Sequence, residues 1–434
     1  MKEISVRQKN IFVMGMDEAN LQVLREIPDA AEYDFHALLT VAELQHGEVS
    51  VPDLLEKART KLDAFDGSID AIVGYWDFPV STIVPILNGQ YGLRGTSLES
   101  IVKCEHKYWS RLEQQKVIEE HPRFGLVSLE TDDPRPPEHM KFPMWLKPVN
   151  SFSSELAFGV KNMDEFQAAV TEIRGGISRI GRPFEYVLEQ LDLPPEIAEV
   201  GGQACLAEEA LQGVQVAVEG YVFDGKVTMY GVLDSIDYPD SSCFLRHQYP
   251  SDLPELVQQR ILSISRRVMT QIGMDNATFS IEYFFDAGTG DVNLLEINPR
   301  HSQSHAELFE YVDGVSNHHC MVSLARGTDP NLLPKHGQYA LAAKWYHRWF
   351  TDGLVQRTPT QDEIAQVEKD IPGVKIEVVP GEDQLLSDSP GQDSYSYELA
   401  HIFVGADSEA EMREKYDRCL AALPFEIDEP SAAR

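Results

Sequence analysis

The sequence predicts a mixed α/β (α+β) protein built from several domains, and three observations support that fold class. Residues 10–102 alternate short apolar runs with amphipathic segments, a pattern typical of a parallel sheet covered by helices. Residues 278–300 contain two apolar runs around the turn sequence DAGTGD, which predicts an antiparallel hairpin. Residues 373–423 contain two strand candidates followed by a helix. A chain of 434 residues is long enough for about two to four domains.

The first part of the chain predicts alternating strands and helices. The run IFVMG at 11–15 is typical of a buried strand, and a helical pattern follows at 19–27. A helix is expected at 51–65, a strand at 70–76 and another helix at 80–93. The GxGxxG fingerprint of dinucleotide-binding folds is missing, so nucleotide binding is not assigned to this region.

Two lysines precede the hairpin in different settings. Lys147 lies inside the apolar run MWLKPV, where a lone lysine is costly unless its ammonium reaches an anion. Lys147 is therefore expected to have an anionic partner. Lys107 lies in the amphipathic stretch LESIVKCEHKYWSRL, and this pattern alone is typical of a solvated lysine on a helix.

The hairpin predicts a pair of facing carboxylates. If the turn is centred on Thr289, Glu282 and Glu296 are equally far from the centre and lie opposite each other, with Cβ atoms roughly 5 Å apart. Like charges repel at that distance, and a divalent cation between them is the simplest compensation. Asn298 follows on the same face, and Arg300 comes two residues later. These groups suit Mg²⁺ that bridges the phosphates of a nucleotide.

An exposed edge hairpin with its glutamates in water is the alternative. It agrees poorly with the apolar residues Phe279, Ile281, Leu294 and Leu295, which make both strands look buried.

Composition and charge exclude some classes of partner. Lys and Arg number 37 and Asp and Glu number 70, and the net charge of -33 argues against nucleic acid or an anionic membrane. A saline habitat is an open alternative explanation of that charge. No apolar run approaches the ~20 residues of a membrane helix, and the N-terminus lacks a secretion signal. The five cysteines are odd in number and lack CxxC spacing, which predicts a cytoplasmic protein.

The motif EINPR that ends the hairpin, with Glu282 upstream, resembles the metal-binding end of the ATP-grasp superfamily. Two further stretches fit in order. MWLKPVNSFSSELAFGV has a serine-rich segment where the family has a glycine-rich phosphate loop, and ACLAEEALQGVQVAVEGYVF is similar to the hinge that carries adenine. In outline the chain resembles bacterial L-amino acid ligases, which are carboxylate–amine ligases, with an architecture like that of biotin carboxylase.

The resemblance implies an ATP-grasp fold in three parts. They are a Rossmann-like N-terminal domain at 1–102, an ATP-grasp domain at 103–328 with its lid at about 140–212, and a β-rich C-terminal domain at 329–434.

The resemblance also implies roles for individual residues, with ATP and Mg²⁺ as cofactors. Glu282, Glu296 and Asn298 hold the metal, and Arg300 and Lys147 act in catalysis. The residues expected to contact ATP are Lys107, Lys147, Ser151, Ser153, Ser154, Glu208, Glu209, Gln215 and Arg246. The residues expected beside the substrate are His247, Arg300, Ser302, Ser304 and His305.

The resemblance implies amide or peptide bond formation through an acyl phosphate, with a small carboxylic acid and an amine as substrates. Whether the protein forms a homodimer is left open. Two alternatives remain. A carboxylase of the biotin carboxylase type has a glutamine and a catalytic glutamate where this chain has Ser302 and Ser304. A non-catalytic ATP-binding sensor fits the serine-rich loop and Gln215, which replaces the family's acidic ribose contact, but it has little need for paired carboxylates.

Overall fold

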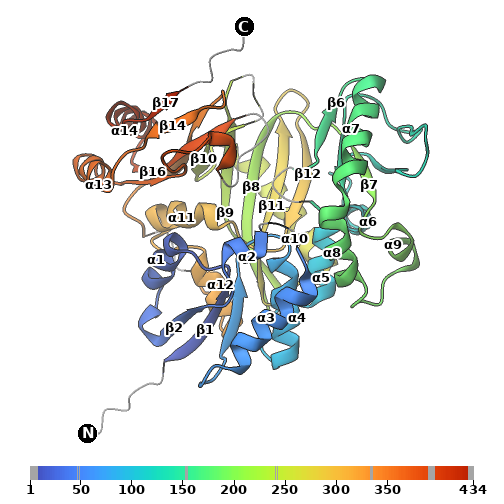
Figure 1. Ribbon diagram of the computed structural model, residues 1–434, viewed down its shortest axis with the longest axis horizontal. Coiled ribbons are helices and arrows are strands. Elements are labelled where there is room, and N and C mark those ends of the chain that lie inside the picture. The colour runs from blue at the N-terminus through green and yellow to red at the C-terminus, as the bar shows by residue number, and fades with distance from the viewer. Residues whose placement is uncertain are drawn as a thin grey trace.

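The computed structural model describes residues 8–45, 47, 49–151, 155–239, 241, 243–332, 336–389 and 396–428. Figure 1 shows a central sheet with the blue N-terminal part below it, the green region around α7 at the upper right and the red C-terminal part at the upper left. In the described part of the chain, no helix is both long and apolar enough to cross a membrane.

The N-terminal part contains the expected parallel sheet. Its strands are β1 (Lys9–Met14), β2 (Tyr33–Ala37) and β3 (Ala71–Gly74), in the order β2-β1-β3. The helices of this part are α1 (Glu18–Glu26), α2 (Val41–Gln45), α3 (Val51–Asp63) and α4 (Val80–Tyr91), with the 3₁₀ helix η1 (Ala30–Glu32) before β2. The predicted alternation is confirmed, whereas β2 had not been predicted, because its residues YDFHA lack a continuous apolar run.

Two short helices carry the chain towards the centre. They are α5 (Leu98–Glu105) and α6 (Lys107–Gln115). His106 ends the first helix and caps the second, since its backbone is extended and its side chain accepts a hydrogen bond from the Trp109 amide. Lys107 is therefore the first residue of α6.

A second, four-stranded sheet has the order β4-β7-β5-β6. Its strands are β4 (Phe124–Val127), β5 (Met144–Pro148), β6 (Phe158–Val160) and β7 (Cys205–Glu209). The helices between its strands are α7 (Met163–Gly176), α8 (Ser178–Leu188) and α9 (Pro195–Val200). β4 precedes the expected lid boundary near 140. Phe184 of α8 packs edge-on against Phe78 of the N-terminal part, with ring centroids 5.6 Å apart, so this region is not a separate body.

The central sheet has eight antiparallel strands in the order β12-β11-β8-β9-β10-β13-β16-β15. The strands are β8 (Val214–Phe223), β9 (Lys226–Asp237), β10 (Phe244–Tyr249), β11 (Ala277–Asp286), β12 (Asp291–Asn298), β13 (Leu341–Trp349), β15 (Val374–Val378) and β16 (Tyr397–Ala406). The long helix α10 (Glu255–Ile272) covers one face, where Ile261 and Ile264 pack with Phe279 and Ile281. The hairpin is thus buried on that face, as expected.

The remaining elements follow β12 in the chain. They are η2 (Gln303–His305), α11 (Ala306–Asp313), α12 (His318–Ala325), β14 (Leu354–Arg357), α13 (Gln361–Asp370), η3 (Leu386–Asp388), α14 (Glu409–Ala422) and β17 (Glu426–Asp428). β14 and β17 form a separate two-stranded sheet. Pairing of β10 with β13 carries the central sheet across the expected boundary at 329. Gly314 ends α11 in the left-handed region, as its sequence position predicts.

Candidate active site

The hairpin places Glu282 opposite Glu296, as predicted, but the turn centre and the strand register differ from those assumed. The turn is tighter than expected: Asp286 pairs with Asp291, so the centre lies before Thr289. On that register alone, Glu282 would face Leu295. A β-bulge next to Glu282 absorbs Leu295 as an extra residue and brings Glu296 opposite Glu282.

Both carboxylates are held by neighbouring side chains. Glu282 accepts hydrogen bonds from the side-chain amides of Gln215, at 2.8 Å, and Asn298, at 3.0 Å. Glu296 lies 3.2 Å from the ammonium of Lys107, which also donates to the Ser151 carbonyl at 2.7 Å. The donors come from β8, β12 and α6, so three elements far apart in sequence meet at the pair.

The two carboxylates differ in their electrostatic environment. Burial, followed by the charge of Glu296, raises the pKa of Glu282. Burial alone would raise the pKa of Glu296 as well, but the ammonium groups of Lys107 and Lys147 outweigh it and lower that pKa. The lysines thus stabilise the negative charge of Glu296, whereas burial and the charge of Glu296 disfavour a second negative charge on Glu282.

This arrangement fits a magnesium ion. Asn298 uses its NH₂ on Glu282, which leaves its oxygen as a ligand beside two carboxylates. Mg²⁺ takes one or two carboxylates and completes its shell with phosphate oxygens and water. Within the described ranges no three His, Cys, Asp or Glu side chains gather into a metal site, so the remaining ligands would come from phosphate and water.

A buried ion cluster lies behind the carboxylate pair. Lys147 contacts Glu208 at 2.6 Å, and the Arg111 guanidinium contacts the other oxygen of Glu208 at 2.7 Å. Burial would raise the pKa of Glu208, but these two cations outweigh it and hold that pKa at about 2. The expected anion beside Lys147 is therefore a protein carboxylate, and Glu208 has no free side chain to offer adenine.

Glu208→Ala is expected to lower the free energy of unfolding by about 3–5 kcal/mol at neutral pH, because it leaves two buried cations without an anion. The folded pKa of Glu208 is below its unfolded value, so this stability is present above about pH 4.5 and is lost as the pH falls towards 2. Denaturant unfolding at several pH values measures the difference. Glu209→Ala is the control, since Glu209 pairs with the exposed Arg123 and should change stability little. Equal effects of the two variants would refute the assignment.

Arg300 is held by a residue that the sequence analysis did not select. Its Nε and Nη2 both donate to Oδ1 of Asp77, at 2.7 and 2.6 Å. Asp77 follows β3, and the carboxyl ends of parallel strands are where ligands usually bind in such sheets. That position was the available signal for Asp77.

Glu105 is a second acidic residue near this group that the sequence did not reveal. It accepts a 2.5 Å hydrogen bond from Ser81, and burial, followed by Asp77, raises its pKa to about 7. It lies at the end of α5, two residues before Lys107.

The predicted hinge lies between the two sheets. β7 belongs to the four-stranded sheet and β8 to the central one, so the chain crosses between them at 210–213. Gly213 has φ +109°, and a Cβ there would lie 2.1 Å from the Phe285 carbonyl oxygen, so only glycine fits. Ser151 of the serine-rich loop is buried beside Lys107, whereas Ser153 and Ser154 lie outside the described residues.

Arg246 and His247 lie on a strand, whereas the resemblance implies a loop for both residues, and that expectation was wrong. Both belong to β10, three strands away from β11, because FLRHQY pairs with β9 and β13. Neighbouring residues of a strand face opposite sides. Arg246 therefore pairs with Glu409 at 3.1 Å and stacks on Trp345, on one side of the sheet. His247 lies on the other side.

The expected substrate residues form a second polar group beside Arg300. His247 packs edge-on against His305 and Tyr346 and hydrogen-bonds Ser235. The same polar group includes Lys344 of β13. Lys344 donates to the Ser304 hydroxyl at 2.7 Å and is only 6% exposed.

Glu219 holds the start of the segment after EINPR. Fully buried, it accepts hydrogen bonds from the Ser302 amide, the His305 ring and the Tyr230 hydroxyl, each at 3.0 Å. Ser302 and His305 thus contact a protein carboxylate, whereas Ser304 points towards Lys344.

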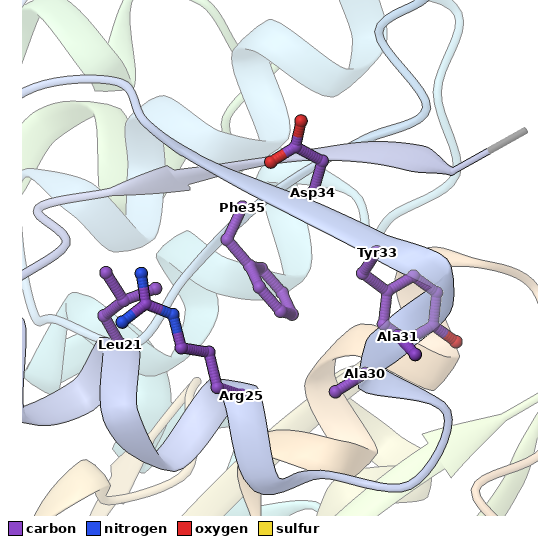
Figure 2. A pocket seen from close by; sticks show the side chains of 7 residues that line it. All are labelled: Leu21, Arg25, Ala30, Ala31, Tyr33, Asp34 and Phe35. Carbon is purple, nitrogen blue, oxygen red and sulfur yellow. The ribbon is translucent and has the colours of Figure 1, made fainter.

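One hollow of the protein lies away from this site. Figure 2 shows it between α1 and β2, with Tyr33 and Phe35 on one side and Leu21 and Arg25 on the other. Its volume is about 320 Å³, but none of the residues assigned to the site above lines it. The chemistry therefore belongs to the carboxylate pair, not to this hollow.

Comparison with known proteins agrees with this geometry. Residues 140–306 match the family model described as the ATP-grasp domain. No curated protein sequence matches the chain significantly. The expected resemblance to the ATP-grasp superfamily is thus confirmed for residues 140–306.

Solved structures show the same fold over nearly the whole chain. The L-amino acid ligase from Bacillus licheniformis is 13% identical, with a TM-score of 0.70 over 97% of this chain and 99% of that one. Phosphoribosylglycinamide synthetase from Anaerococcus prevotii is 14% identical, with a TM-score of 0.63 over 97% and 100%. Biotin carboxylase from Campylobacter jejuni is 15% identical, with a TM-score of 0.63 over 98% and 93%. The predicted fold class is confirmed.

Proposed function

We propose that this chain is an ATP-dependent carboxylate–amine ligase, which joins an amino acid or another small carboxylic acid to an amine. The observation that carries this proposal is the facing pair Glu282 and Glu296, with Asn298 beside it and Arg300 two residues beyond. A protein that only binds ATP has little need for such a pair.

The reaction has two steps. A carboxylate oxygen of the acid attacks the γ-phosphorus of ATP, the bond to ADP breaks, and an acyl phosphate forms. The amine nitrogen then attacks the acyl carbon, loses a proton, and expels phosphate. Magnesium held by Glu282, Glu296 and Asn298 would neutralise charge on the phosphates.

The chain's own residues supply the remaining charge and geometry. Lys107 lies at the edge of the carboxylate pair, where its ammonium can turn from Glu296 to a phosphate oxygen. We assign Lys147 to the phosphates as well, with Glu208 holding it in place. Arg300 has a planar fork that binds two oxygens at once, so it suits the transferring phosphoryl group and the tetrahedral intermediate.

We place the acid substrate between Asp77 and Lys344. Lys344 is a nearly buried ammonium that contacts the Ser304 hydroxyl and the ring faces of Tyr346 and Phe403. The charge of Lys344 acts on Glu377 and Glu398, which lowers the pKa of both carboxylates, but Lys344 forms no ion pair with a carboxylate in the described part of the chain. A buried cation in this setting gains from a negatively charged ligand. His247 lies opposite Lys344 on the neighbouring strand and packs against His305, with ring centroids 4.9 Å apart.

The carboxylase alternative is less well supported. Ser302 and Ser304 stand where a carboxylase has its glutamine and catalytic glutamate, and the Ser304 hydroxyl is engaged by Lys344. A hydroxyl in that place cannot act as the base for bicarbonate.

A substrate matrix tests the proposal. Pairs of amino acids and small carboxylic acids, together with bicarbonate and amine-free controls, are incubated with Mg-ATP, and ADP, phosphate and product mass are measured. The expected result is phosphate release that requires both partners and a product equal to acid plus amine minus water. ATP binding without turnover would favour a sensor, and turnover with bicarbonate alone would favour a carboxylase.

The proposal includes a cytoplasmic location, which fits five buried, free cysteines. The substrates are small molecules. A homodimer remains a prediction that sedimentation measurements would check.

A further inference from the structure

Arg111 makes an unusual set of contacts for a buried arginine. Its side chain is 3% exposed, and its three nitrogens all donate. Nε donates to Glu208 at 2.7 Å, and Nη1 to the Gln114 side chain at 2.6 Å. Nη1 and Nη2 also donate to two consecutive backbone carbonyls, those of Leu294 at 3.1 Å and Leu295 at 2.5 Å.

These two carbonyls belong to the β-bulge. Leu295 is the extra residue that shifts the register between Tyr283 and Glu282. If the bulge were lost and Leu295 paired normally, Leu295 would face Glu282, and Glu296 would turn to the opposite face of the sheet because side chains alternate along a strand. The bulge is thus what makes the carboxylates face each other, and Arg111 binds its backbone directly.

The bulge lies on the outermost strand of the sheet. Within the described residues β12 pairs with β11 alone, so no further described strand holds its outer edge. Two other groups cover that edge: the Arg111 guanidinium, and the Glu120 carbonyl, which accepts from the Leu294 amide at 2.9 Å. An edge bulge without such partners has unpaired carbonyls and freedom to shift register.

Helix α6, which carries Arg111, also connects the bulge to the lysines. Lys107 lies one turn before Arg111 on α6 and contacts Glu296. Glu208 is shared between Arg111 and Lys147. A lysine at position 111 could still reach Glu208, but a single ammonium cannot bind the carboxylate and both carbonyls in one plane.

We propose that Arg111 is a positioning residue: it fixes the bulge that turns Glu296 towards Glu282, and thereby sets the affinity of the carboxylate pair for a divalent cation. This inference rests on the proposed function, since it takes the pair to be the metal centre. Arg111 is not itself a metal ligand, but in this proposal it controls where the ligands Glu282 and Glu296 lie.

The test is Mn²⁺ binding to the full chain, measured by electron paramagnetic resonance with and without ADP, for Arg111→Lys and Arg111→Met. Both variants are expected to raise the Kd for Mn²⁺ at least tenfold. Arg111→Lys should keep a thermal transition close to that of the unchanged protein, because its ammonium still pairs with Glu208. If the methionine variant fails to fold, the lysine variant carries the test.

Arg260→Met is the matched control. Arg260 also donates to a carbonyl of this hairpin, that of Gly290 at 3.0 Å, but at the turn and not at the bulge. Its Kd for Mn²⁺ should not change. A folded Arg111→Lys variant with unchanged Mn²⁺ affinity would overturn the role of Arg111. Unchanged Mn²⁺ binding by Glu296→Gln would instead overturn the metal centre, and with it both proposals.

Discussion

Glu296→Gln is expected to lower turnover at least about a thousandfold, since the loss of several kcal/mol of charge stabilisation corresponds to that factor. Glutamine keeps the size of the side chain and its contact with Lys107, but it removes the negative charge that faces Glu282. The variant should therefore fold and should lose Mn²⁺ binding. ADP release and metal binding are the measurements.

The hairpin supplies its own control for this experiment. Asp286 and Asp291 also face each other, at the exposed end of the same two strands. Asp291→Asn removes one of two opposed carboxylates without approaching Lys107 or Asn298, and turnover should stay near that of the unchanged protein. Turnover of Glu296→Gln at the level of Asp291→Asn would contradict the metal assignment.

The facing pair shows what a local pattern can predict. The turn residues and the apolar runs predicted two strands and the opposition of Glu282 and Glu296, and both were correct. The assumed turn centre was not. The tighter turn shifts the expected pairing by one residue, and the bulge shifts it back by one. The two shifts cancel at Glu282. They do not cancel at Tyr283, which lies between the turn and the bulge and pairs with Leu294.

Long-range contacts account for most of what the sequence did not reveal. Lys147 was expected to have an anionic partner because a buried ammonium needs one, yet no local pattern identifies Glu208 as that partner. Arg111 reaches Leu295 across 184 positions, and Asp77 reaches Arg300 across 223. Periodicity describes which face of an element is buried, and it contains no information about which distant element covers that face.

The C-terminal strands illustrate the same limit. GVKIEVVP and YELAHIFVGA predicted β15 and β16, but their place in the central sheet follows from β13, which joins them to β10. β13 had not been predicted, because LAAKWYHRW mixes polar and apolar residues. Its Lys344 and Tyr346 were therefore missing from the expected substrate residues.

The contact between Arg300 and Asp77 leads to the second large effect. In the resting protein the Arg300 guanidinium is already neutralised by Asp77, at 2.6 Å, so it adds little to the binding of ATP. In the transition state, negative charge develops on oxygens that its second edge can bind. Arg300→Ala is accordingly expected to lower kcat by about 10²–10³-fold and to change the KM for ATP by less than about threefold.

Steady-state kinetics with saturating acid and amine measure this split. Arg94→Ala is the matched control, because Arg94 also links the N-terminal part to the central sheet, through Asp224 and Asn276, but away from the carboxylates. Its kcat should stay near that of the unchanged protein. If Arg300→Ala instead raises the KM for ATP with kcat intact, Arg300 contributes to ground-state binding, and stabilisation of the tetrahedral intermediate must come from Lys107 or Lys147.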